Sequence, residues 1–146
     1  MKQIYFIFDL ILVRYNFKNN SMLYSNITEK IIASALNVHT TLGNGFPEKF
    51  YQRALEIEMP FQELSFKREL EMPVFYREIN IGNRRVDFFV EDKIMVELKA
   101  VDELNGAHLS QTLNYLEASK KEIGLLFNFG ARSLEIRRVH NNKINK

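Results

Sequence analysis

Three charged residues lie inside two apolar runs near the middle of the chain, and their placement constrains the fold more than any other feature. Asp87 belongs to the run Arg84–Val90, and Glu97 and Lys99 belong to the run Lys93–Val101. Burying an unpaired charge costs several kcal/mol or forces the group to become neutral. We therefore expect these side chains to be paired with one another or to hold a metal ion.

The two runs are separated only by Glu91 and Asp92, which predicts a tight turn between two strands. Strand alternation puts Glu97 and Lys99 on one face and makes Asp87 a close cross-strand or diagonal neighbour of Glu97. Two adjacent carboxylates repel each other, and the pKa of one rises unless a cation separates them. This set suggests a divalent cation and a hydrolysed phosphate ester. An ordinary half-exposed strand with a Glu-Lys pair is the alternative.

Alternation also predicts which neighbours these acids have along their own strands. Asp87 should share its face with Arg85 and Phe89, and Glu97 should share its face with Met95. The Glu97 face is therefore not simply the solvent side of the sheet.

Size and composition indicate one domain with a substantial core. The chain has 146 residues, of which 46% are hydrophobic, and a formal net charge of +2. The absence of cysteine excludes a disulfide scaffold, a thiolate zinc site and a cysteine nucleophile. The mild positive charge permits nucleic-acid binding without requiring it. The histidines have no zinc-ligand spacing, and the sequence has neither a phosphate loop nor a dinucleotide fingerprint.

The two ends of the chain differ from its middle. Residues 1–21 are predicted to be an extension outside the core, with Met22 as the functional start. Their apolar stretches, interrupted by Asp9, are shorter than the roughly 20 residues that span a bilayer. We expect no stable membrane span and a cytoplasmic protein. A poor signal peptide or a membrane-touching segment is the alternative. Residues 141–146 are predicted to be a basic C-terminal tail.

Periodicity predicts an α/β domain with a mixed sheet. The first helix should begin with Asn26 as N-cap and Glu29 closing a capping box, and should end at Gly43. A turn is expected at residues 81–83, and Pro73 indicates an edge strand or a bulge. The expected helices are residues 27–42, 47–60 and 107–120, and the expected strands are residues 66–76, 85–90, 93–101, 123–129 and 134–139.

Three further polar residues are candidates for the site. Glu48 lies in the first turn of the second helix, where the helix dipole alone is sufficient reason for a carboxylate. Gln111 and Tyr115 are one turn apart on the third helix and share a face. A solvated polar face is the alternative to Gln111 pointing over the site.

These motifs follow one another in a recognisable order. Gly45–Tyr51 has the spacing Gly-x-x-Glu-x-x-Tyr, and the segments Asp87–Val90, Val96–Ala100, Gln111–Leu116 and Gly124–Gly130 follow it. In this order the chain resembles the GxxExxY proteins, a branch of the PD-(D/E)XK nuclease superfamily, over residues 22–139. Val86 stands where the superfamily often has a proline.

The resemblance implies a fold and a set of roles. The fold would be a restriction-endonuclease-like core of order α-β-β-β-α-β, with a mixed central sheet and an extra N-terminal helix, in a nuclease-like domain at residues 22–140. Asp87, Glu97 and the backbone carbonyl of Leu98 would hold Mg²⁺, with Mn²⁺ as a substitute. Glu48 would complete the metal shell or orient water. Lys99 would activate the attacking water and steady the phosphate charge.

The implied activity is metal-dependent hydrolysis of phosphodiester bonds in DNA or RNA, with Gln111 and Tyr115 as accessory residues and a homodimer to grip the nucleic acid. One alternative is a catalytically weak module of the same fold that binds nucleic acid or a protein partner. Another is a structural or oligomerising domain in which Glu97 and Lys99 form a buried ion pair.

Overall fold

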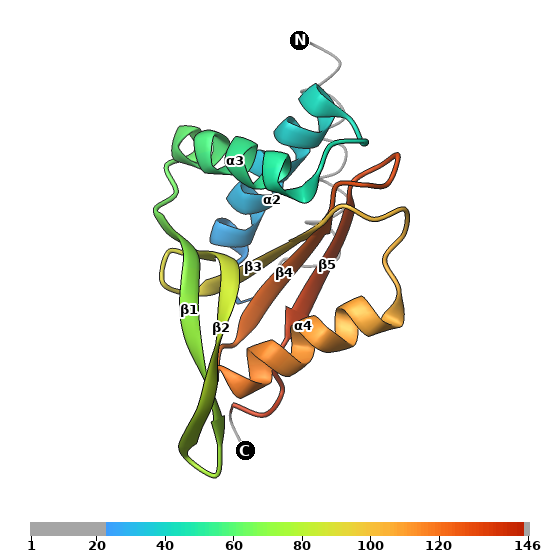
Figure 1. Cartoon of the computed structure of the whole chain (residues 1–146). Coiled ribbons are helices and arrows are strands. Elements are labelled where there is room, and N and C mark those ends of the chain that lie inside the picture. The colour runs from blue at the N-terminus through green and yellow to red at the C-terminus, as the bar shows by residue number, and fades with distance from the viewer. Residues whose placement is uncertain (1–22, 145–146) are drawn as a thin grey trace.

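The fold is a five-stranded sheet with helices on both faces (Figure 1). The computed structural model describes residues 23–144. In chain order the elements are α2 (Ser25–Leu42), α3 (Glu48–Glu58), a short 3₁₀ helix η1 (Met59–Gln62), β1 (Phe66–Tyr76), β2 (Ile79–Val90), β3 (Ile94–Lys99), α4 (Gly106–Ala118), β4 (Ile123–Asn128) and β5 (Glu135–His140).

The strands lie in the sheet in chain order, β1-β2-β3-β4-β5. All neighbours are antiparallel except β3 and β4, which are parallel and are connected through α4. The sheet is therefore mixed, and the order helix, three strands, helix, strand follows an additional first helix. This confirms the predicted α/β class and the restriction-endonuclease-like core.

The core is divided between the two faces of the sheet. On one face α2 and α3 pack against Phe88, Val96 and Leu98. On the other face α4 packs through Leu116 against Met95. Covering both faces explains why the central strands are continuous apolar runs. The sheet lies between these two helical layers (Figure 1).

The hairpin β1–β2 differs from the sequence prediction. The turn predicted at residues 81–83 is wrong, because the chain reverses at Arg77 and Glu78, which both have positive φ. A β-bulge between Val74 and Phe75 shifts the register, so the glycine of the predicted turn lies inside β2. Glycine is common at bulges as well as at turns, which accounts for the error. The predicted edge strand at Pro73 is confirmed, since β1 is the outer strand.

The helix boundaries agree closely with the predicted ones, whereas the predicted helix cap does not. The capping box predicted at Asn26 and Glu29 is wrong, because α2 starts at Ser25 after Tyr24 in the left-handed conformation, with no side-chain cap. A capping box is present instead at α4, where the Asn105 and His108 side chains bond each other's backbone N–H. The other elements begin and end within about two residues of the predicted positions, apart from β2.

The predicted extension at residues 1–21 lies outside the described residues. Within residues 23–144, no helix has the length and apolar character needed to cross a bilayer. At the other end, Asn141 is buried and its side chain donates to the carbonyl of Lys121 at 2.9 Å. The start of the predicted basic tail is thus attached to the end of α4.

Candidate active site

The two central carboxylates meet at the end of the β2–β3 pairing. Phe88 with Val96 is the last pair of this register, and Asp87 and Glu97 are the next residues of the two strands. Asp87 Oδ2 accepts a hydrogen bond of 2.8 Å from the backbone N–H of Leu98. The structure thus brings together the two acids that the short turn was predicted to make neighbours.

Side-chain alternation breaks at Asp87. Val86 and Phe89 both pack on the α4 face, whereas Phe88 between them packs on the α2–α3 face. On the paired strand β1, Glu69 stands opposite the break and has a φ of 52°. The expectation that Asp87 shares the face of Phe89 is therefore wrong. The break turns the Asp87 carboxylate toward α3.

Glu97 is a buried carboxylate with one paired oxygen. Only 5% of Glu97 is exposed, and its Oε2 forms an ion pair of 3.1 Å with the Arg84 guanidinium. Its Oε1 is also buried and has no hydrogen-bond partner within residues 23–144. The burial of Glu97 agrees with its position in an apolar run, and its free oxygen is an acceptor available to a cation.

Helix α4 reaches this carboxylate through Arg84. The guanidinium carbon of Arg84 lies 3.4 Å from the ring centroid of Tyr115. The Tyr115 hydroxyl accepts a hydrogen bond of 3.2 Å from the Gln111 side chain. The two residues predicted to be accessory thus form one chain of contacts, and Gln111 contacts Tyr115 rather than the acids.

Helix α3 contributes from the opposite layer. Glu48 is its first residue and is exposed, and Gln52 one turn later is buried. The Gln52 side-chain amide donates to Asp87 Oδ1 at 3.2 Å. Because residues four apart share a helix face, α3 directs both Glu48 and Gln52 toward Asp87.

Tyr51 holds the start of α3 in place. Its hydroxyl donates to the carbonyl of Gly43 at 2.6 Å and accepts from the N–H of Phe46 at 3.2 Å. Its ring is fully buried and stacks on Phe129 at 4.7 Å. The tyrosine of the Gly-x-x-Glu-x-x-Tyr motif therefore has a structural role, because it fixes the loop that positions Glu48.

Lys99 ends β3 without a salt-bridge partner. In the described part of the chain its ammonium has no carboxylate within 4.0 Å, although its charge lowers the pKa of Glu48, Asp87 and Glu97. The alternative of a buried Glu97–Lys99 ion pair is therefore wrong, since Arg84 takes that place. Lys99 is close to all three acids and still has its hydrogen-bond donors free.

The chain after Lys99 is held by a buried asparagine. Asn128, opposite Lys99 in β4, accepts from the N–H of Val101 at 3.0 Å and donates to its carbonyl at 2.9 Å. These bonds satisfy a backbone segment that has left the sheet. They fix the direction in which the loop departs from the site.

The three acids at the site all have raised pKa values. Burial raises the pKa of Glu97 to about 8, and the negative charge of Asp87 adds to this against the attraction of Arg84 and Lys99. Burial also raises the pKa of Asp87, although the hydrogen bond from Leu98 lowers it. Desolvation raises the pKa of Glu48, with Asp87 contributing. Burial is the main cause of all three shifts, so a bound cation would lower these pKa values by favouring the charged forms.

The available donors fit a hard divalent cation. Asp87 and Glu97 offer carboxylate oxygens, of which Glu97 Oε1 is buried and unpartnered. In a strand the N–H and C=O of one residue point to the same side, so the Leu98 carbonyl points toward Asp87 as its N–H does. Oxygen ligands of this kind suit Mg²⁺, which keeps several waters. Across residues 23–144, no three acidic or histidine side chains cluster closely enough to hold a metal, so Glu48 does not complete such a set.

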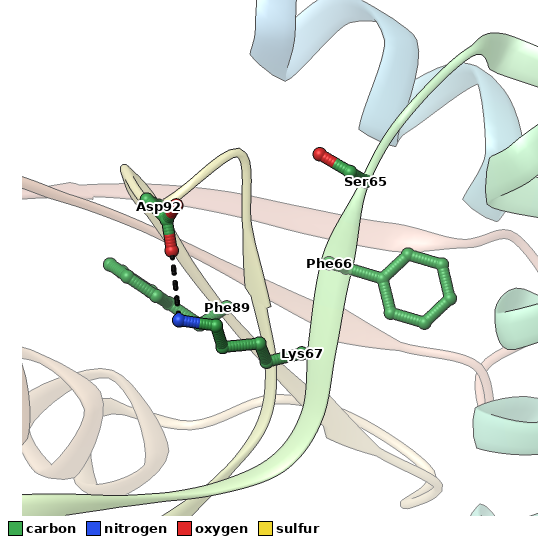
Figure 2. Close-up of a pocket in the computed structure, with 5 residues that line it drawn as sticks. All are labelled: Ser65, Phe66, Lys67, Phe89 and Asp92. Atoms are coloured by element: carbon green, nitrogen blue, oxygen red, sulfur yellow. Dashed lines mark ion pairs between the residues drawn. The ribbon is translucent and has the colours of Figure 1, made fainter.

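A separate hollow lies at the other end of β3 (Figure 2). It has a volume of about 110 Å³ and is lined by Ser65, Phe66, Lys67, Phe89 and Asp92. Lys67 and Asp92 form an ion pair of 3.3 Å across it. It contains none of the predicted site residues, and its two charges neutralise each other.

The sequence profile of the PD-(D/E)XK nuclease superfamily matches residues 25–139. The chain belongs to this superfamily. No curated protein matches the chain in sequence. A solved structure titled "Crystal structure of SSO0001" aligns with a TM-score of 0.49 and 20% identity. The alignment covers 88% of the present chain and 60% of the other, so the present chain spans about 60% of the length of that protein.

Two site residues escaped the sequence analysis. Gln52 was detectable, because it lies one helical turn after Glu48 on the same face. Arg84 was not, because it precedes Asp87 by three residues and strict alternation places it on the opposite face. Only the break in alternation at Asp87 brings Arg84 to Glu97.

Stability should fall with rising pH when no divalent cation is present. Folded Glu97 has a pKa near 8 and an ordinary value of 4.5, so the folded state keeps a proton that the unfolded state has released. The stability due to this proton is complete below about pH 4.5 and is lost as the pH rises through 8. Melting temperatures measured from pH 5 to 9 in chelator should decline, and Glu97→Gln should flatten the decline. The exposed control Glu103→Gln should follow the wild type. Equal declines in Glu97→Gln and the wild type would contradict the assignment.

Removing the Tyr51 hydroxyl should destabilise the protein. Tyr51→Phe removes the hydrogen bonds to the Gly43 carbonyl and from the Phe46 N–H, each worth about 0.5–1.5 kcal/mol. Chemical denaturation should show this loss. Tyr76→Phe, at a position 62% exposed, is the matched control and should change the unfolding free energy little. The same small effect in both variants would show that the loop does not depend on Tyr51.

Proposed function

We propose that the chain is a divalent-metal-dependent nuclease that hydrolyses phosphodiester bonds of DNA or RNA. The observation that carries the proposal is the pairing of half-buried Asp87 with buried Glu97 in a domain of this superfamily. Among residues 23–144, Glu97 Oε1 has no hydrogen-bond partner and the nearby Lys99 forms no ion pair. The order of motifs and the Glu48-x-x-Tyr51 spacing support membership of the GxxExxY branch.

Each residue has a defined part in this proposal. Asp87, Glu97 and the Leu98 carbonyl hold the cation, Mg²⁺ or Mn²⁺, and Gln52 fixes the rotation of the Asp87 carboxylate. When bound, such a cation polarises a phosphoryl oxygen, lowers the pKa of a bound water and stabilises the leaving oxygen.

Lys99 and Glu48 supply the remaining groups. The Lys99 ammonium donates hydrogen bonds to the attacking water and to the charged phosphate oxygens. It forms no ion pair with any residue of the range 23–144, which leaves these donors available. Glu48, exposed at the start of α3, accepts from that water and orients it. Its raised pKa suits a group that accepts a proton during reaction.

The proposal extends to partners and place. Nucleic acid is the substrate, and a homodimer would provide two such sites on one duplex. A cytoplasmic location accords with the absence of a membrane-spanning helix from the described residues.

A catalytically weak module that binds nucleic acid or a protein partner is the second candidate. It is favoured by the Arg84 ion pair, which already neutralises part of Glu97, and by the lack of a three-acid cluster within residues 23–144. Cleavage assays separate the two proposals.

The full chain should cleave nucleic acid only with a divalent cation. Wild type, Asp87→Asn and the exposed control Asp102→Asn are incubated with labelled single- and double-stranded DNA and RNA in Mg²⁺, Mn²⁺ or EDTA. Asp87→Asn should lower the rate at least about 100-fold, equivalent to about 2.7 kcal/mol of transition-state stabilisation. Asp102→Asn should match the wild type. Binding without metal-dependent cleavage would favour the second candidate, and equal rates in all three proteins would reject the site.

Lys99→Met should separate catalysis from cation binding. The lysine acts on water and phosphate, so the variant should lose cleavage while Mg²⁺ still raises its melting temperature as in the wild type. Loss of both cleavage and stabilisation by Mg²⁺ would show that Lys99 supports cation binding by the carboxylates rather than the chemical step.

A further inference from the structure

Among the described residues, Arg84 is the one side chain that contacts both the acidic pair and helix α4. Its guanidinium pairs with Glu97 Oε2 at 3.1 Å and stacks at 3.4 Å on the ring of Tyr115. Only 22% of its side chain is exposed, and its Nε is buried without a partner among residues 23–144. The aromatic ring and the carboxylate are therefore what hold the guanidinium in place.

This arrangement makes the two oxygens of Glu97 unequal. Oε2 is paired with Arg84, and Oε1 is buried and has no hydrogen-bond partner among the described residues. A carboxylate can bind a cation through one oxygen or through both. With Oε2 held in the ion pair with the Arg84 guanidinium, only Oε1 remains for a cation shared with Asp87.

We propose that Arg84 is a positioning residue that makes Glu97 a one-oxygen ligand and thereby favours Mg²⁺ over Ca²⁺. The inference rests on the proposed function, because it requires a cation at Asp87 and Glu97. Mg²⁺ demands near-octahedral geometry with compact ligands, whereas Ca²⁺ accepts six to eight oxygens and readily takes both oxygens of one carboxylate. Because Arg84 leaves only one Glu97 oxygen for the cation, the larger Ca²⁺ ion is disfavoured.

The stacking on Tyr115 explains why an arginine is needed here. A guanidinium is planar, lies flat on an aromatic ring and presents its N–H groups in fixed directions, whereas a lysine ammonium is a flexible point charge. Gln111 in turn holds the Tyr115 hydroxyl at 3.2 Å. The face of α4 thus orients the guanidinium, and the guanidinium orients Glu97.

A simpler role for Arg84 predicts a different result. If Arg84 were only a positive charge near the cation, replacing it with a neutral residue would raise the affinity for every divalent ion alike. Replacing it with lysine would then change nothing. The positioning role predicts instead a change in the ratio of the two affinities when the charge is kept.

The test measures cation binding by titration calorimetry on the full chain, with MgCl₂ and CaCl₂ and without nucleic acid. Arg84→Lys should weaken Mg²⁺ binding about 10-fold to 100-fold, the usual effect of losing a residue that orients a metal ligand, and Ca²⁺ binding should be unchanged or stronger. Tyr115→Leu should shift the ratio in the same direction, although it touches neither acid. Arg85→Lys is the matched control, because Arg85 is exposed and pairs with Glu71.

The possible outcomes are distinct. Equal changes for both ions in Arg84→Lys, or none, would overturn the positioning role and leave the proposed nuclease intact. If the wild type bound neither ion, the proposed function would fail as well. Should Arg84→Lys not fold, as judged by circular dichroism, Tyr115→Leu alone decides, since it leaves every charge in place: an unchanged ratio overturns the inference and a shift toward Ca²⁺ supports it.

Discussion

The burial of one carboxylate is the constraint on which the rest of this structure depends. Glu97 lies in the central strand β3 with almost no access to water, and an isolated charge in that place would cost several kcal/mol. Two cations approach it, Arg84 in direct contact and Lys99 without contact, yet its pKa remains far above that of a free glutamate. The protein thus holds an acid that its own positive groups do not fully compensate. The proposed nuclease accounts for such an acid, because the cation that it would hold supplies the missing positive charge.

The three layers of the fold meet at this acid because of the way the chain is wound. The tight turn between β2 and β3 brings Asp87 and Glu97 together just beyond the last pair of the two strands, Phe88 with Val96. Helix α3 on one side supplies Gln52 to Asp87, and α4 on the other side supplies the ring beneath Arg84. The parallel pairing of β3 with β4 requires the crossover through α4, which carries that helix past the end of β3. Each layer therefore fixes a different group around the same pair of oxygens.

Much of this arrangement could be predicted from the sequence, and the failures have physical causes. Element order and the meeting of Asp87 with Glu97 followed from apolar periodicity and one short turn. The hairpin turn was misplaced because glycine is equally suited to the bulge that the chain uses there. Arg84 could not be predicted as a site residue because alternation fails at Asp87. That failure lies opposite the irregularity at Glu69 in β1, which sequence patterns do not encode. The alternative that paired Glu97 with Lys99 is wrong, because Arg84 forms the ion pair with Glu97.

The β2–β3 hairpin has a consequence for how the molecule assembles. Arg84, Asp87 and Glu97 all belong to this one hairpin, so the acids and their contacting cation are close in sequence as well as in space. Contacts of short sequence separation need little loop closure and can form before distant elements dock. Glu97 can therefore be paired with Arg84 before the apolar core closes around it, and folding does not require burial of an unpaired carboxylate.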